Sequence, residues 1–162
     1  MKSSHGYVSH LRTAQQGFTL GELLMVLAIT GILTALAAPS FSQFIENQRM
    51  KSMASDLNAS LTLTRSEAIK RNTNVTMSPT TAGAWQSGWQ IADPTNAGAN
   101  IQVHDAYTRV TATGPASVTY MSSGRVQGAT APAFDISAAG ISNQYCVSVD
   151  LSGRPNVKAS GC

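Results

Sequence analysis

The sequence predicts an α+β protein in which a long N-terminal helix packs on antiparallel β-sheets. Three observations predict this fold class. Residues 23–38 are mostly apolar and carry no charge. A helical period in the apolar side chains then continues almost to Arg71. In the second half of the chain, short segments alternate apolar and polar residues, as half-buried strands do.

The first part of the predicted helix is apolar enough to cross a membrane. A spanning helix needs ~20 apolar residues for a hydrocarbon core of ~30 Å. Residues 23–38, together with Phe18–Leu20, supply this length. One carboxylate, Glu22, lies near the start of the segment. A lone acid in a membrane segment is costly, so it marks a functional residue that needs a partner.

The second part of the predicted helix is amphipathic and ends in the polar turn Asn72–Asn74. A helix from Phe18 to Arg71 would be ~80 Å long, too long for a compact domain of this size. We therefore expect its first half to lie in lipid or against other subunits and its second half to pack on a sheet. The side chains expected to face that sheet are Met50, Met53, Leu57, Leu61, Thr64 and Ala68.

The clearest strand signal is the alternation of apolar with polar or small residues from Tyr145 to Leu151. Loops are expected at Pro79–Gly83, Asp93–Asn100 and Gly128–Pro132. Shorter strands are expected at Val75–Ser78, Gly88–Ile91, Ile101–His104, Arg109–Thr113, Ser117–Met121 and Phe134–Ile136. Trp85 and Trp89 are expected in the core.

The start of the chain resembles the class III signal of type IV prepilins and pseudopilins. A cationic leader ends in Gly17, Phe18-Thr19-Leu20 follows, and the acid is at Glu22. The resemblance implies that a membrane peptidase cuts after Gly17 and methylates the new N-terminus at Phe18. It also implies that Glu22 pairs with the N-terminal amine of a neighbouring subunit. The alternative for Glu22 is a side chain that reaches the membrane interface without a partner.

A secretory signal is the alternative interpretation of this region, because Ala35-Leu36-Ala37 is an acceptable A-x-A cleavage site. The carboxylate at the start of the apolar segment and the long leader argue against it. With the positive leader in the cytoplasm, the domain after the apolar segment lies in the periplasm.

The two cysteines, Cys146 and Cys162, lack the C-x-x-C spacing of a redox or zinc site. A disulfide persists in the periplasm, so we expect these two to be joined. The alternative is two free thiols.

Four internal segments resemble the GspH/FimT group of minor pilins and pseudopilins. They are Arg65–Asn72, Trp85–Trp89, Tyr120–Arg125 and Val147–Arg154. The resemblance implies a pilin-like fold with a cleaved leader at 1–17, a transmembrane half-helix at 18–45 and a periplasmic domain at 46–162. It implies a single-pass protein of the bacterial inner membrane that enters a fibre.

The function implied by the resemblance is that of a minor pilin that helps to prime and cap a type IV pilus. The alternatives are a minor pseudopilin at the tip of a type II secretion pseudopilus and a DNA-binding minor pilin of natural transformation. The implied partners are other minor pilins or pseudopilins, the major pilin, the prepilin peptidase and the inner membrane. Neither catalytic nor metal-binding spacing is recognisable, so we expect a structural subunit without a cofactor rather than an enzyme.

Bulk charge does not favour a protein that coats nucleic acid. The formal charge is +3, from 11 basic and 8 acidic residues. Removing Lys2 and Arg12 with the leader leaves 9 − 8 = +1.

DNA contact would therefore need a local patch of cations. Ser-Gly-Arg occurs twice, ending at Arg125 and Arg154. Some GspH/FimT members bind DNA through a C-terminal Gly-Arg-x-Arg motif. Here Asn156 replaces the second arginine, and Lys158 follows two residues later. DNA contacts would then be made by Arg154, Lys158 and Arg125; the alternative is that Arg154 is a solvent-exposed turn residue.

Overall fold

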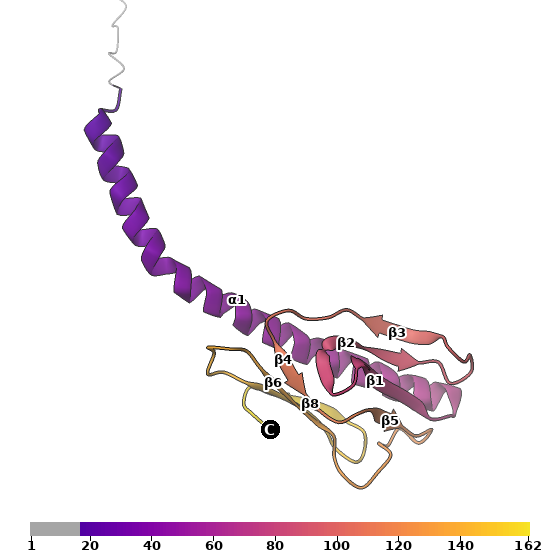
Figure 1. Ribbon diagram of the computed structural model, residues 1–162. Helices are drawn as coiled ribbons and strands as arrows, with labels where there is room; N and C mark the ends of the chain where they lie inside the picture. The colour runs from indigo at the N-terminus through magenta and orange to yellow at the C-terminus, as the bar shows by residue number, and fades with distance from the viewer. Residues whose placement is uncertain (1–16) are drawn as a thin grey trace, which may run out of the picture. The chain divides into compact units, whose positions relative to one another are not determined.

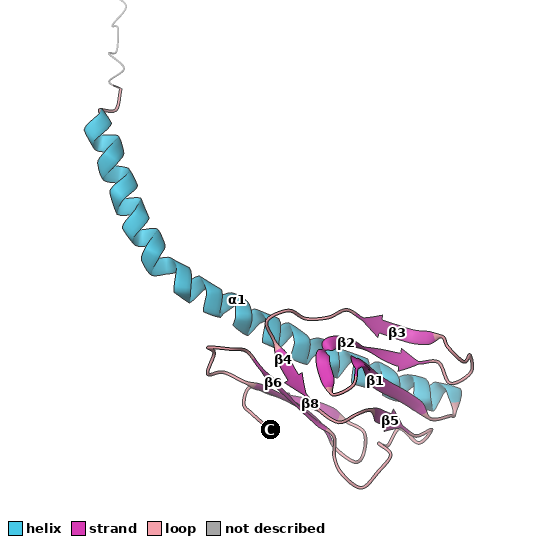
Figure 2. Cartoon of the chain, in the orientation of Figure 1, coloured by secondary structure: helices cyan, strands magenta, loops and turns pink. Residues whose placement is uncertain are grey.

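The structure is a computed structural model that describes residues 17–162, without the side chains of residues 37–39. The predicted leader therefore lies outside the described residues, except for Gly17. One long helix is followed by strands (Figures 1 and 2), which confirms the α+β class. The elements are α1 (Leu20–Arg71), β1 (Val75–Thr81), β2 (Ala84–Ala92), β3 (Asn100–His104), β4 (Thr111–Thr113), β5 (Val118–Tyr120), β6 (Ala133–Ser137), β7 (Tyr145–Val149) and β8 (Pro155–Lys158).

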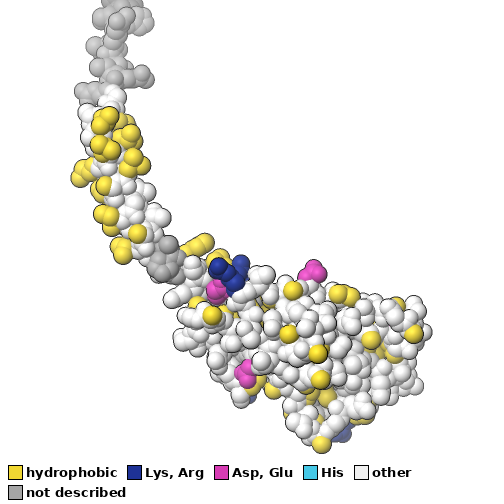
Figure 3. Space-filling view, in the orientation of Figure 1, with side chains coloured by type: hydrophobic (Ala, Val, Ile, Leu, Met, Phe, Trp, Pro, Cys, Tyr) yellow, Lys and Arg dark blue, Asp and Glu magenta, His cyan; other side chains and the backbone are white. Residues whose placement is uncertain are grey.

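The chain divides into two compact units, Met1–Pro39 and Ser40–Cys162. In the described part of the first unit, the apolar side chains of α1 are exposed (Figure 3). Among the described residues, α1 is the one helix long and apolar enough to cross a membrane. This finding agrees with the expected membrane segment.

The second unit contains two antiparallel sheets of four strands each. One has the strand order β3-β2-β1-β5, and the other has the order β4-β6-β7-β8. Consecutive strands are neighbours in β1–β2, β2–β3, β6–β7 and β7–β8, so these connections are hairpins rather than crossovers.

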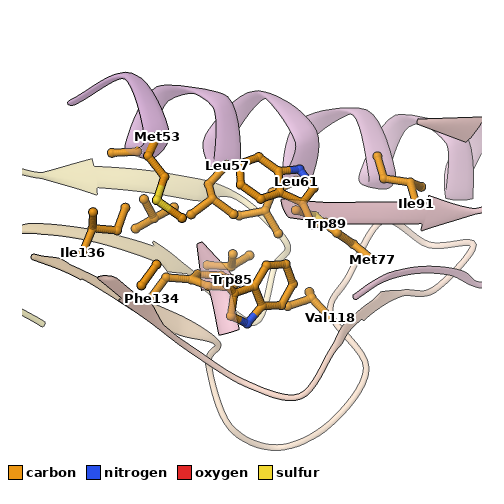
Figure 4. Close-up of a cluster of buried hydrophobic side chains, with 14 of the residues drawn as sticks. Met53, Leu57, Leu61, Met77, Trp85, Trp89, Ile91, Val118, Phe134 and Ile136 are labelled. Atoms are coloured by element: carbon orange, nitrogen blue, oxygen red, sulfur yellow. The ribbon is translucent and has the colours of Figure 1, made fainter. Parts of the chain in front are cut away.

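The second half of α1 supplies one side of the core, as its period predicts. Met50, Met53, Leu57, Leu61, Thr64 and Ala68 have no exposed surface. They pack with apolar strand residues that include Trp85, Trp89, Phe134 and Ile136 (Figure 4). Both tryptophans are wholly buried, as predicted.

Two polar contacts fix the tryptophans. The Trp89 indole N–H donates to Ser60 Oγ at 2.9 Å, and the Trp85 N–H donates to the Pro115 carbonyl at 2.8 Å. A buried indole N–H needs such a partner, so these bonds determine how the rings are oriented.

The helix ends where the sequence predicts. Asn72 has a φ of 50°, in the left-handed region that asparagine tolerates. The Thr73 amide donates to the Ala68 carbonyl at 3.2 Å. Arg71 is the last residue of α1. Its Nη1 donates to Asp93 Oδ1 at 2.8 Å and ties the helix end to the segment after β2.

Several predicted strand limits were wrong. Arg109 was expected in a strand, but it has a φ of 62° and β4 begins at Thr111. A loop was expected over Pro79–Gly83, but β1 continues to Thr81 and β2 starts at Ala84, because the turn at Gly83 is tight. β8 was not expected at all, because a short segment starting with proline has no strand signal of its own.

Candidate functional site

The start of α1 is held by reciprocal hydrogen bonds between Thr19 and Glu22. The Glu22 amide donates to Thr19 Oγ1 at 3.2 Å, and the Thr19 amide donates to Glu22 Oε2 at 2.9 Å. The Thr19 hydroxyl also donates to the same oxygen at 3.0 Å. This is a capping box, which satisfies backbone N–H groups that the first turn of a helix leaves unpaired.

The capping box gives the Glu22 carboxylate a partner within its own chain. Phe18, the residue that the class III resemblance makes the mature N-terminus, is 86% exposed next to it. Gly17, Phe18, Thr19 and Glu22 line one open hollow. Glu22 Oε2 accepts the bonds of Thr19, and Glu22 shares this hollow with the two residues of the predicted cleavage site, Gly17 and Phe18.

The two cysteines form the expected disulfide. Their Cα atoms are 5.0 Å apart, and 16 residues of sequence separate them. The Cys162 amide also donates to Asp135 Oδ1 on β6 at 2.7 Å. The chain's last residue is thereby held against β6 and β7.

The two Ser-Gly-Arg turns lie directly against each other. A Cβ placed on Gly153, at φ +86°, would lie 2.0 Å from the Gly124 carbonyl oxygen. Glycine is therefore required at position 153. Arg65 of α1 connects the two turns, since its Nε donates to the Gly124 carbonyl at 3.0 Å and its Nη2 to the Ser152 carbonyl at 3.3 Å. We call Arg65 and the turns at Gly124 and Gly153 the paired turns.

The predicted DNA contacts lie at and beside the paired turns. Arg154 and Lys158 line one hollow beside β7 and β8, about 410 Å³ in volume. Arg125 is exposed on the neighbouring turn. The Arg154 side chain is 75% exposed, but its Nε lies 3.5 Å from Asp150 Oδ2.

Asp150 is an anion at ordinary pH and offsets Arg154. Hydrogen bonds from the Ser152 hydroxyl and the Arg154 amide lower the pKa of Asp150 to about 2. The local charge of Arg65, Arg125, Arg154, Lys158 and Asp150 is thus 4 − 1 = +3.

His104, at the end of β3, packs against an aromatic ring and lies near a carboxylate of α1. Its ring stacks on Trp89 with centroids 4.1 Å apart, and its Nε2 lies 3.6 Å from Asp56 Oδ2 on α1. The Tyr107 hydroxyl donates to the same carboxylate oxygen. Burial, and then the bond to Asp56, raise the pKa of Tyr107. His104 is therefore part of the packing between α1 and β3, with a side-chain exposure of 24%.

Comparison with known families decides the class of protein. Residues 53–153 match the family described as type II transport protein GspH. The chain belongs to the GspH family. Residues 12–38 also match the prokaryotic N-terminal methylation motif, which includes the predicted cleavage and methylation site.

Solved structures of two proteins share the fold of this GspH-family chain. The type IV minor pilin FimU of Pseudomonas aeruginosa is 24% identical, with a TM-score of 0.62 over 71% of this chain and 92% of the other. The minor pseudopilin EpsH of the type 2 secretion system of Vibrio cholerae is 15% identical, with a TM-score of 0.54 over 68% and 97%. They confirm the pilin-like fold.

Curated relatives match over a shorter stretch. The type IV major alpha-pilin of Moraxella bovis is 43% identical over 49 residues, 30% of this chain and 31% of that protein. The fimbrial protein EcpC of Eikenella corrodens is 45% identical over 40 residues, 25% and 26% of the two chains. The matches span about a third or less of these relatives.

Two residues of these sites were not predicted from the sequence. Thr19 has a recognisable signal, since Thr-x-x-Glu before an apolar run is the pattern of a capping box. Arg65 has none, because its carbonyl partners lie 59 and 87 residues further along the chain.

Proposed function

We propose that this GspH-family chain is a minor pilin subunit that helps to prime and cap a type IV pilus. It is a structural subunit rather than an enzyme. The observation that carries the proposal is the start of α1, where an exposed apolar helix opens with a carboxylate inside the matched methylation motif. The prepilin peptidase cuts after Gly17, and the mature subunit stays anchored in the inner membrane until it is assembled into the fibre.

The capping box gives Glu22 two separate contributions in this proposal. Before assembly, Thr19 satisfies one carboxylate oxygen and lowers the cost of an acid at the membrane. During assembly, the negative charge attracts the N-terminal amine of a neighbouring subunit. Pairing two charges in a packed bundle removes the cost of an isolated one.

Matched substitutions separate the two contributions. Glu22→Gln keeps an oxygen that can accept the Thr19 bonds but removes the charge. Thr19→Val removes the cap hydroxyl but keeps the charge. We expect Glu22→Gln to abolish incorporation into sheared fibres, and Thr19→Val to reduce it only in part. Both variants should be found in the inner membrane in normal amounts. Normal incorporation of Glu22→Gln would refute the assembly function of the charge.

The main alternative is a minor pseudopilin of a type II secretion system. Minor pilins and minor pseudopilins have the same fold, so a deletion phenotype in the cell is needed to distinguish the two functions. Deletion should reduce the number of surface pili in one case and the secretion of folded enzymes in the other. Loss of secretion with normal piliation would replace our proposal with the pseudopilin alternative.

A second candidate function, DNA binding, is favoured by the paired turns. They bring Arg65, Arg125 and Arg154 onto neighbouring backbone segments, although Asp150 offsets part of the charge. With three phosphate contacts, log K should fall against log salt with a slope of only about −2.7.

A mobility-shift titration at low salt tests this candidate. Arg154→Ala should weaken binding, while Asp150→Asn should strengthen it by removing the offsetting charge. Binding that neither variant changes would exclude the paired turns as the DNA site.

A further inference from the structure

The proposed function does not use a second group of charged residues, which consists of Glu46, Arg49 and Arg109. Glu46 of α1 is 8% exposed. Its Oε1 accepts from Arg49 Nη1 at 3.4 Å and from Arg109 Nη1 at 3.3 Å. Both guanidinium groups are thus anchored on a single buried oxygen.

The two arginines keep most of their hydrogen-bonding capacity. A guanidinium has five N–H donors, and among the described residues each of these two uses one. The Arg109 side chain is 73% exposed and that of Arg49 is 38% exposed. With Glu46 the group has a charge of 2 − 1 = +1.

These residues adjoin a pocket of about 420 Å³. Arg109 and Glu46 line it with the polar side chains of Ser42, Gln43 and Thr111. Arg109 has a φ of 62°, which is unusual for a residue with a side chain, so the loop holds it there at a conformational cost. The lining of the pocket therefore combines the Arg109 guanidinium with hydroxyl and amide groups. Arg49 does not line the pocket, but it shares the Glu46 oxygen with Arg109 and gives the group its second positive charge.

The helical residues that line this pocket, Ser42, Gln43 and Glu46, directly follow the predicted membrane segment in the sequence of α1. About 20 helical residues counted from Leu20 cross the ~30 Å hydrocarbon core, and the headgroup layer of roughly 5–7 Å covers the next four or five. Phe41 and Phe44 are 66% and 58% exposed, so this level of α1 also presents large apolar side chains. Water would be an unfavourable environment for both rings.

The geometry points to a binding site for the phosphate of an anionic membrane phospholipid, formed by Arg109, Arg49 and the polar lining of this pocket. A guanidinium matches the geometry of a phosphate and donates to it in pairs. The excess positive charge selects an anionic headgroup over a zwitterionic one. Lipid bound here would hold the domain at the membrane surface until assembly. The inference rests on the membrane anchoring of the proposed function.

Native mass spectrometry of the full mature chain in detergent tests this assignment. Phosphatidylglycerol and phosphatidylethanolamine are titrated separately, and inorganic phosphate is added as a competitor. We expect one phosphatidylglycerol per chain, bound in preference to phosphatidylethanolamine. Arg109→Gln should weaken binding about tenfold, the effect of losing a charged hydrogen bond. Lys70→Gln, near the C-terminal end of α1, removes one exposed positive charge, so it is the matched control and should leave phosphatidylglycerol binding unchanged.

A second variant guards against a folding artefact. Gln43→Glu adds a negative charge at an exposed helical position of the pocket lining, so it should repel the lipid and keep the thermal melting of the domain. Retention of phosphatidylglycerol by both pocket variants, or equal retention of the two lipids, would overturn the assignment. Displacement of the lipid by an equal concentration of inorganic phosphate would overturn it as well.

Measuring fibre incorporation in parallel separates this inference from the proposed function. If Arg109→Gln bound lipid normally but failed to enter fibres, the site would belong to an acidic side chain of a neighbouring subunit instead. If it lost lipid but entered fibres normally, the lipid site would stand independently of assembly.

Discussion

Replacing Arg65 by methionine tests the contact on which the paired turns depend. Arg65 donates to the carbonyls of Gly124 and Ser152, at 3.0 Å and 3.3 Å. Methionine keeps a long apolar stem and a similar helix propensity, so the substitution removes mainly the donors. The carbonyl of Gly124, a buried residue, then loses its charged partner.

The expected loss is about 2 kcal/mol. A hydrogen bond from a charged group contributes roughly 1.5–3 kcal/mol, and solvent access to the Ser152 side reduces the sum of the two bonds. Arg65→Lys keeps the charge but not the fork of N–H donors, so it should lose about half as much.

Urea unfolding of residues 40–162, followed by circular dichroism, measures the effect. Arg125→Met is the matched control, since Arg125 is exposed on the same turn, and it should change stability by less than about 0.5 kcal/mol. An unfolding free energy for Arg65→Met within that margin of the wild-type value would refute the reasoning. An equal loss in the control would refute it too.

Three further predictions concern the disulfide, the acid response and processing. Cys162→Ser should destabilise the domain by about 3 kcal/mol in urea, because Cys146 then no longer closes a loop of 16 residues; unchanged stability in non-reducing buffer would contradict this. The lowered pKa of Asp150, about 2, lies below the unfolded value of about 3.9. Its stabilising contribution is therefore complete above pH ~4 and is lost as the pH falls towards 2. Asp150→Asn should therefore make the urea midpoint of unfolding less dependent on pH over that range. Intact mass of the mature protein should show Phe18 as the first residue with one added methyl group, whereas a first residue at Ala38 would prove the secretory alternative.

The sequence alone determined the elements whose signal is local. The apolar run, the three-to-four-residue period of α1 and the alternation in β7 depend only on neighbouring residues, so all three could be predicted closely. The helix end at Asn72 is local as well, because a polar turn residue tolerates the left-handed backbone. The disulfide followed from cysteine count and compartment.

The exact strand limits depended on pairing and not on local pattern. The local sequence places Arg109 at the start of a strand. In the structure it lies in a loop with a left-handed backbone conformation, and its side chain contacts Glu46. β8 exists because Val147 and Val149 on β7 offer it a partner edge. Sequence pattern says little about a strand whose stability comes from its neighbour.

The functional surfaces divide in the same way. Glu22 and its processing site were predictable, because the residues that define them are adjacent in the chain and match a motif. The paired turns and the pocket lined by Glu46 and Arg109 were not predictable, because each joins α1 to segments more than 55 residues away. Their geometry exists only after the helix has packed on both sheets, so the tertiary structure alone decides which of the chain's few charged residues act together.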